Sequence, residues 1–93
     1  MNTNVIAAID SERKYQEQKW PNHLHTIGEF ILIMEKCLND AKRAWVYGTD
    51  QSLHEIRQVT AVGVAAMEQH AAPMRTPLHL APHAPITKES HEI

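Results

Sequence analysis

Residues 26–48 read TIGEFILIMEKCLNDAKRAWVYG, and this stretch decides the fold. Its apolar side chains recur at spacings of three and four, which is typical of a helix with one buried face. Thr26 and Glu29 have the spacing of a capping box, in which each side chain accepts a hydrogen bond from the other residue's backbone amide. Gly48 can adopt the left-handed conformation that commonly follows a helix. The sequence predicts a helix over residues 27–47, and its apolar positions are Ile27, Phe30, Ile31, Met34, Cys37, Leu38, Ala41 and Trp45.

A second capping-box pattern follows after a short turn. Ser52 and Glu55 have the same spacing, and they open another run of apolar residues with helical periodicity over residues 53–70. Two helices joined by so short a turn form an antiparallel hairpin. Gly63 lies among small residues in the middle of the second helix, where a glycine costs about 1 kcal/mol relative to alanine. We therefore expect another helix to approach closely at Gly63.

The remaining residues predict one more helix and a tail. A broken apolar stripe, formed by Val5, Ile6, Ile9 and Tyr15, predicts a helix over residues 5–20, and Pro21 ends it. The prolines after Ala72 cannot continue a helix, so an extended tail is expected. The predicted fold is all-α: a helical domain over residues 1–72, made of an antiparallel hairpin and an N-terminal helix, followed by an extended Pro-rich tail over residues 73–93 (Pro73, Pro77, Pro82 and Pro85).

Composition excludes several classes of partner. The chain has 93 residues and a formal net charge of −2, which gives no basic surface for duplex nucleic acid or an anionic membrane. No apolar run approaches the roughly 18 residues of a membrane span. A single cysteine, Cys37, suits the reducing cytoplasm. Because so short a chain buries little surface, we expect a homo-oligomer built as a helical bundle.

Few residues indicate chemistry on spacing alone. In an antiparallel hairpin the end of the first helix lies beside the start of the second, so Asp40 and Glu55 are the acids expected to approach each other. An alternative interpretation is that Glu29 and Glu55 only cap their helices and that Asp40 is a solvated surface acid. Cys37 lies on the apolar face and is expected to be buried and unreactive.

Several spaced motifs resemble a known family. They are Glu12-Arg13 with Gln16, Lys19-Trp20, His25-Thr26 before Gly28-Glu29-Phe30, and the run from Glu55 to His70. Together they resemble small bacteriophage proteins of the MazG-like type, in the all-α nucleoside triphosphate pyrophosphohydrolase group. The resemblance implies Mg²⁺ held by Glu-x-x-Glu on one helix and Glu-x-x-Asp on the next. It also implies release of pyrophosphate and a nucleoside monophosphate.

Carried onto this sequence, the resemblance places the first metal pair on Cys37 and Asp40 and the second on Glu55 and Gln58. The candidate Mg²⁺ ligands are therefore Asp40 and Glu55. Cys37 and Gln58 stand where the family has acids, and a thiol and a neutral amide are weak ligands for Mg²⁺, which prefers charged oxygens.

The sequence thus predicts a MazG-like protein that binds a nucleotide or a nucleotide signal without hydrolysing it. Sequestration of a messenger of host defence is one role that a phage could give such a protein. One alternative is an Mg²⁺-dependent nucleoside triphosphate pyrophosphohydrolase, and another is an interaction module that blocks a host protein. The residues expected to contact the nucleotide are Lys14, Lys19, Trp20, Lys36 and Arg57.

Overall fold

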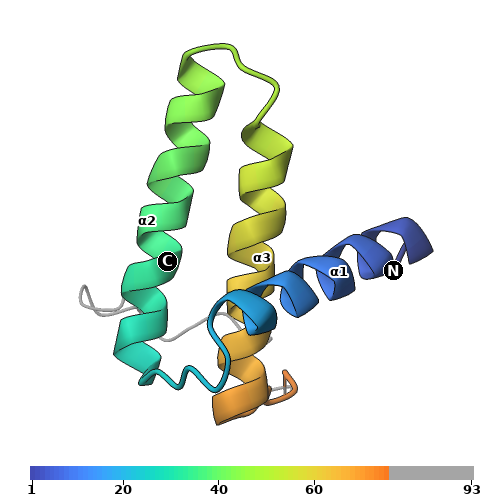
Figure 1. The fold of residues 1–93 in the computed structure, drawn as a ribbon, viewed down its shortest axis with the longest axis vertical. Coiled ribbons are helices and arrows are strands. Elements are labelled where there is room, and N and C mark those ends of the chain that lie inside the picture. The colour runs from blue at the N-terminus through green and yellow to red at the C-terminus, as the bar shows by residue number, and fades with distance from the viewer. Residues whose placement is uncertain (76–93) are drawn as a thin grey trace.

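The computed structural model describes residues 1–75 and contains three helices in that part of the chain. They are α1 (Thr3–Lys19), α2 (Ile27–Val46) and α3 (Ser52–His70). Figure 1 shows α2 and α3 side by side and antiparallel, while α1 crosses α3 and projects away from the hairpin at its N-terminal end. The prediction of an all-α hairpin with an N-terminal helix is confirmed.

Both ends of α2 are fixed as the sequence predicts. The Thr26 hydroxyl accepts from the Glu29 amide at 3.1 Å, and the Glu29 carboxylate accepts from the Thr26 amide at 2.8 Å. Gly48 has a φ of 70°, and its amide donates to the Trp45 carbonyl at 3.1 Å. The Thr49 amide donates to the Ala44 carbonyl at 3.1 Å, which completes the Schellman motif. The turn into α3 therefore begins from a well-defined helix end.

The prediction of a second capping box at the start of α3 is wrong. Ser52 is the first residue of α3 rather than its N-cap, and Gln51, the N-cap, makes no capping hydrogen bond with its side chain. The turn before it is organised by Thr49, whose hydroxyl donates to the Ala44 carbonyl and accepts from the Gln51 amide. Because these bonds let Gln51 adopt helical dihedral angles, the helix starts before the serine can serve as its cap.

The hydrophobic core is small. Its buried apolar side chains come only from the hairpin, and no large side chain in residues 1–75 is completely buried. The prediction of one buried face on α2 is therefore only half right. The part of that face that points to α3 is covered, and the other part is exposed because, among the three helices, α2 packs against α3 alone. The buried apolar residues are Phe30, Cys37, Val59, Ala61 and Ala65.

Gly63 lies at a close approach, as expected, but the neighbour is a side chain and not a backbone. A Cβ atom at Gly63 would lie 3.2 Å from Cε of Met34 on α2. The end of a methionine side chain can move, so this contact does not set how closely the backbones of α2 and α3 approach.

The docking of α1 on α3 is largely polar. Ala61 is completely buried, and it lies on the same face of α3 as Arg57 and Glu68, which bind α1, so a small side chain there lets the two helices approach. Gln16 is the buried residue of α1, and its Nε2 donates to the Gln58 carbonyl at 3.3 Å. The predicted apolar stripe on α1 is wrong as a core face for Val5, Ile6 and Tyr15, which are about half exposed, whereas Ile9 is partly buried. Arg13 and Glu12 supply the contacts that apolar residues were expected to make.

The predicted tail falls almost entirely outside the described residues. Of residues 73–93, the structure describes only 73–75, which are not helical. Within residues 1–75, no helix has the length and apolar character needed to cross a membrane.

The two hydroxyl residues at the helix starts should differ in their effect on stability. We expect Thr26→Ala to lower the free energy of unfolding by roughly 1 kcal/mol, because it removes a capping hydrogen bond. Ser52→Ala should lower it by much less, because Ser52 caps nothing. Urea unfolding followed by circular dichroism measures both values, and an equal loss in the two variants would contradict the structure at the start of α3.

Candidate functional site

A cleft of about 510 Å³ lies between the C-terminal half of α1 and the start of α3, and we call it the α1–α3 cleft. Its size falls in the range of small-molecule sites. Aromatic, basic and acidic side chains all contribute to its walls. The lining residues are Glu12, Tyr15, Gln16, Lys19, Trp20, Gln51, His54, Glu55, Arg57 and Gln58.

Arg57 is held in place on one wall of the cleft. Its Nε donates to Oε1 of Glu12 at 2.8 Å, and only 11% of the Glu12 side chain is exposed. Its Nη1 lies 2.8 Å from Nδ1 of His54, and because a guanidinium can only donate, this ring nitrogen is the acceptor. The Glu12–Arg57 ion pair joins α1 to α3 and fixes the direction of the guanidinium.

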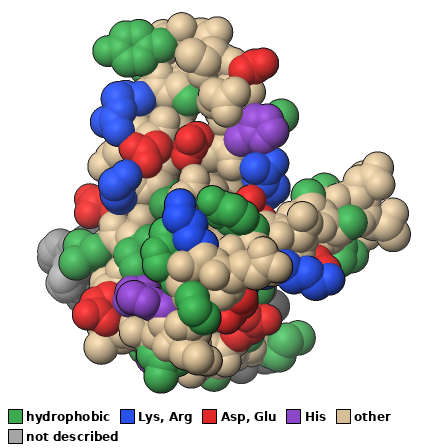
Figure 2. Space-filling model, in the orientation of Figure 1, with side chains coloured by type: hydrophobic (Ala, Val, Ile, Leu, Met, Phe, Trp, Pro, Cys, Tyr) green, Lys and Arg blue, Asp and Glu red, His purple; other side chains and the backbone are tan. Residues whose placement is uncertain are grey.

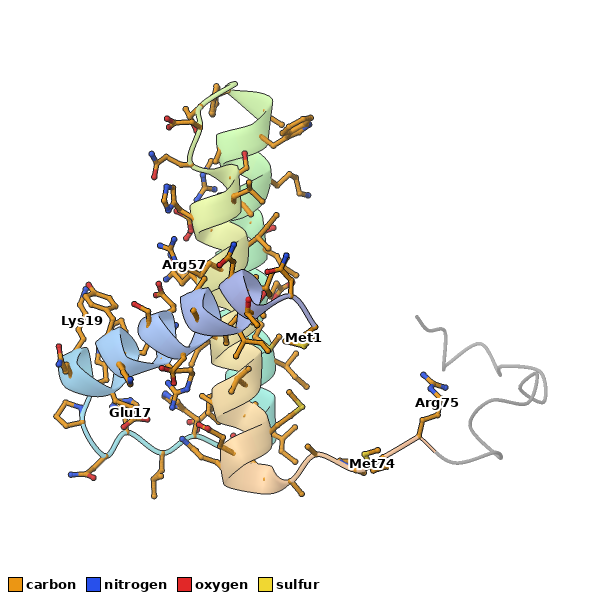
Figure 3. The ribbon with its side chains drawn as sticks, turned by 90° about the vertical axis from the view of Figure 1, so that its right-hand side faces the viewer. Met1, Glu17, Lys19, Arg57, Met74 and Arg75 are labelled. Atoms are coloured by element: carbon orange, nitrogen blue, oxygen red, sulfur yellow. The ribbon has the colours of Figure 1, made fainter. Side chains whose placement is uncertain are left out.

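Lys19 stands at the end of α1 beside two aromatic rings. Its Nζ lies 5.0 Å from the centre of the Trp20 ring and 5.7 Å from that of Tyr15, and it donates to the Tyr15 hydroxyl at 3.4 Å. Such cation–π contacts hold an ammonium group in place without neutralising its charge. Figure 3 shows Lys19 and Arg57 on the same side of α3. Two cations from different helices therefore border one cleft.

The structure separates the predicted nucleotide contacts into two groups. Lys19, Trp20 and Arg57 line the α1–α3 cleft, together with the predicted metal ligand Glu55. Lys14 and Lys36 do not line it. Lys14 pairs with Asp10 on the surface of α1 at 3.0 Å, and Lys36 pairs with Asp40 on α2 at 3.0 Å.

Asp40 is surrounded by cations of its own helix. Its Oδ2 accepts from Lys36 at 3.0 Å and its Oδ1 from Arg43 at 2.5 Å. The hydrogen bond from Lys36 is the main cause that holds the pKa of Asp40 below its ordinary value, and the charges of Lys36 and Arg43 act in the same direction. Figure 2 shows acidic side chains between basic ones on the face of the hairpin above α1. The carboxylate is ionised, and the two neighbouring cations already balance its charge.

The residues at the implied metal positions form a poor donor set for Mg²⁺. Two of them, Cys37 and Gln58, carry no carboxylate, and both oxygens of Asp40 already accept hydrogen bonds. Among residues 1–75, no three His, Cys, Asp or Glu side chains are grouped so that they could hold a metal ion. Glu55 on the cleft wall is the remaining acidic candidate.

Cys37 is buried, as predicted, with 5% of its surface exposed. Burial raises the pKa of its thiol, and the negative charges of Asp40 and Glu55 raise it further, although Lys36 opposes them. A thiol with a raised pKa is a poor nucleophile at neutral pH, which agrees with an inert core position.

A second cavity of about 310 Å³, the apolar cavity, lies next to the cleft. Phe30, Ile33 and Cys37 of α2 contribute to its apolar walls. The two spaces share Gln16, Trp20 and Gln58, so they are adjacent parts of one region. The other residues that line the apolar cavity are Arg13, Glu17, His23, His25, Val62, Ala65 and Gln69.

The loop between α1 and α2 is tied to the end of α3, which closes one side of the apolar cavity. Oε1 of Gln69 accepts from the His25 amide at 3.1 Å, and its Nε2 donates to the His23 carbonyl at 3.2 Å. Nε2 of His70 donates to the His25 carbonyl at 2.7 Å. The Phe30 ring packs edge-on against the rings of both His25 and His70. His70 therefore holds the loop, beyond the helix-dipole role that its position suggests.

Sequence reasoning missed six of the ten residues that line the cleft, and three of the six position its cations. Glu12, Tyr15 and His54 were not among the predicted contacts, although they position Arg57 and Lys19. For Tyr15 a local signal existed, because a tyrosine and a lysine four residues apart share a helix face. The Glu12–Arg57 pair spans 45 residues, and no local pattern predicts it.

Comparison with known proteins gives no family assignment. No protein-family model, curated protein or solved structure matches the chain.

The lowered pKa of Asp40 can be measured by an NMR titration of the side-chain carboxyl groups. We expect Lys36→Ala to raise it, because the main hydrogen bond is lost, while Lys42→Ala should leave it unchanged. Since the folded pKa lies below the unfolded one, ionised Asp40 stabilises the fold above its unfolded pKa. This contribution is lost as the pH falls through the folded value. An Asp40 pKa that does not change in Lys36→Ala would show that the hydrogen bond from Lys36 is not its main cause.

Proposed function

We propose that this chain binds a nucleotide or a nucleotide signal in the α1–α3 cleft and does not hydrolyse it. One observation carries the proposal: Lys19, Trp20 and Arg57, which come from two helices, line the same cleft. This combination suits a ligand with both a phosphate group and a planar ring.

The phosphate would lie between the two cations. The Nη2 atom of Arg57 makes no hydrogen bond among the described residues, so it can donate to a phosphate oxygen while Glu12 and His54 hold the rest of the group. Lys19 adds a second charge from the opposite wall. Because Glu12 and Glu55 also line the cleft, the site suits a ligand with few charges better than a triphosphate.

The base would enter the adjoining apolar cavity. Trp20 borders both spaces and offers a ring face for stacking. Gln16 and Gln58 also border both, and carboxamides can donate to and accept from the edge of a base. Apolar walls with a few polar groups are the usual composition of such a site.

Binding is favoured over catalysis because the residues at the metal positions are poor Mg²⁺ ligands. The resemblance to MazG-like phage proteins supports a nucleotide as the ligand and the cytoplasm of a host cell as the location. On this proposal the protein withholds a nucleotide messenger from host defence. An Mg²⁺-dependent hydrolase that uses Asp40 and Glu55 is the alternative that a direct assay separates.

Isothermal titration tests the proposal with ATP, AMP and cyclic di-AMP, each in Mg²⁺ and in EDTA. We expect at least one of them to bind equally well in both. Lys19→Ala should weaken binding roughly tenfold, because a charge-assisted hydrogen bond is lost. Lys14→Ala is the matched control, since Lys14 lies on the same helix but outside the cleft.

Three results would overturn the proposal. The first is that none of the three nucleotides binds. The second is that Lys14→Ala weakens binding as much as Lys19→Ala, which would place the ligand elsewhere. The third is release of pyrophosphate from ATP in Mg²⁺ that both Asp40→Ala and Glu55→Ala abolish, which would establish the hydrolase instead.

A further inference from the structure

Within residues 1–75, the hairpin carries exposed apolar side chains on both α2 and α3. We define this apolar seam by Ile31, Leu38 and Trp45 on α2 and by Leu53, Ile56 and Met67 on α3, which are 47–76% exposed. Met34 on α2 and Gly63 on α3 meet where the two helices contact each other, and by helical angle each lies beside the row on its own helix, so the two rows flank one helix–helix contact. Scattered apolar side chains are common on protein surfaces, but a continuous patch marks a binding surface.

The seam lies on a part of the hairpin that α1 does not reach. Ile56 precedes Ala61 by five residues, which places it about 140° around the α3 axis from the alanine that α1 covers. Neither cavity includes any of the six seam residues in its walls. The seam is therefore independent of the proposed nucleotide site.

The spacing of the seam fits another pair of helices. Ile31, Leu38 and Trp45 recur every seven residues along α2. On α3, Leu53 and Met67 are two such repeats apart, with Ile56 between them. A seven-residue repeat keeps one row of side chains facing a partner helix that lies nearly parallel or antiparallel. A hairpin with two such rows is half of a four-helix bundle.

We propose that a second copy of this chain covers the seam, with the two hairpins related by a twofold axis that passes beside Leu38. In such an isologous contact the two α2 helices run antiparallel, and if one residue meets a second residue of the other copy, the reverse pair forms as well. An axis at Leu38 sets Leu38 opposite itself and Ile31 opposite Trp45 of the second copy. The largest exposed side chain of α2 is then covered at both ends of the interface.

Charge complementarity supports the second copy as the occupant. Glu35 and Lys42 flank the row on α2, are seven residues apart, and make no ion pair among the described residues. The same axis brings Glu35 of one copy beside Lys42 of the other, and the reverse pair forms at the symmetry-related place. Opposite charges that flank an apolar row set the orientation of paired helices. One axis therefore satisfies both the apolar and the charged residues.

Charge exchange tests the arrangement, with mass measured by light scattering during gel filtration and affinity by sedimentation equilibrium. We expect twice the mass of the chain for the wild type. Glu35→Lys and Lys42→Glu should each raise the dimer dissociation constant roughly tenfold, because each places like charges together. The double variant Glu35→Lys/Lys42→Glu should return the dissociation constant to the wild-type value. Both positions are exposed, and circular dichroism of each variant checks that the hairpin still folds.

The position of the axis has its own test. In a background with Cys37→Ala, Leu38→Cys should form a disulfide-linked dimer under mild oxidation. Asn39→Cys, which lies about 100° away on the same helix, should not. A wild-type monomer at tens of micromolar would overturn the proposal. So would a double variant no tighter than the single ones, equal crosslinking at both positions, or a seam that associates only with an unrelated protein. Because no seam residue lines the cleft, nucleotide binding can fail or succeed independently of all these results.

Discussion

The position of α1 depends on a narrow polar contact with one helix. α1 packs on α3 and makes no close backbone contact with α2, so its place is set where Ala61 lets the two helices approach. Around that point, Glu12 pairs with Arg57, and the buried Gln16 bonds the backbone of α3. A nearly buried carboxylate cannot lose its partner cheaply, because an unpaired charge would remain. The ion pair is thus the main constraint on α1.

Both cavities exist because α1 is held there. The C-terminal half of α1 forms one wall of the α1–α3 cleft and borders the apolar cavity, and the loop after it is fastened to α3 by Gln69 and His70. The contact that holds the helix also aims the guanidinium of Arg57. Structure and proposed binding therefore share one group: a change that frees α1 would also remove the phosphate contact.

The hairpin divides its apolar residues between two tasks. One set lies between α2 and α3 and forms the small core, while the other forms the exposed seam. So small a core leaves a chain of this length with little apolar burial, and this agrees with a protein that is completed by association. The proposed nucleotide site, on α1 and α3, and the proposed interface, on α2 and α3, then use different parts of the molecule.

Local patterns in the sequence predicted local structure well. Helical periodicity located α2 and α3 within a residue or two, and Thr26, Glu29 and Gly48 marked the ends of α2. Ser52 failed because hydrogen bonds of the preceding turn, and not the serine, decide where α3 begins.

Tertiary placement was harder to predict. The docking face of α1 is mostly polar, so hydrophobic periodicity carried little information about it, and three of the four residues of the expected stripe are exposed. Lys19, Trp20 and Arg57 were identified by residue type and by the family resemblance. Their meeting in one cleft, and the exclusion of Lys14 and Lys36, depend on how α1 crosses α3. Spacing along one helix cannot supply that information.

Amide hydrogen exchange measured by mass spectrometry tests the central claim, that the Glu12–Arg57 pair holds α1 on α3. The account predicts that Glu12→Ala speeds exchange over residues 3–19 and leaves residues 27–46 and 52–70 protected. Glu17→Ala, which removes a more exposed carboxylate of the same helix, should change little. Equal exchange in the two variants, or an unprotected α1 in the wild type, would contradict it.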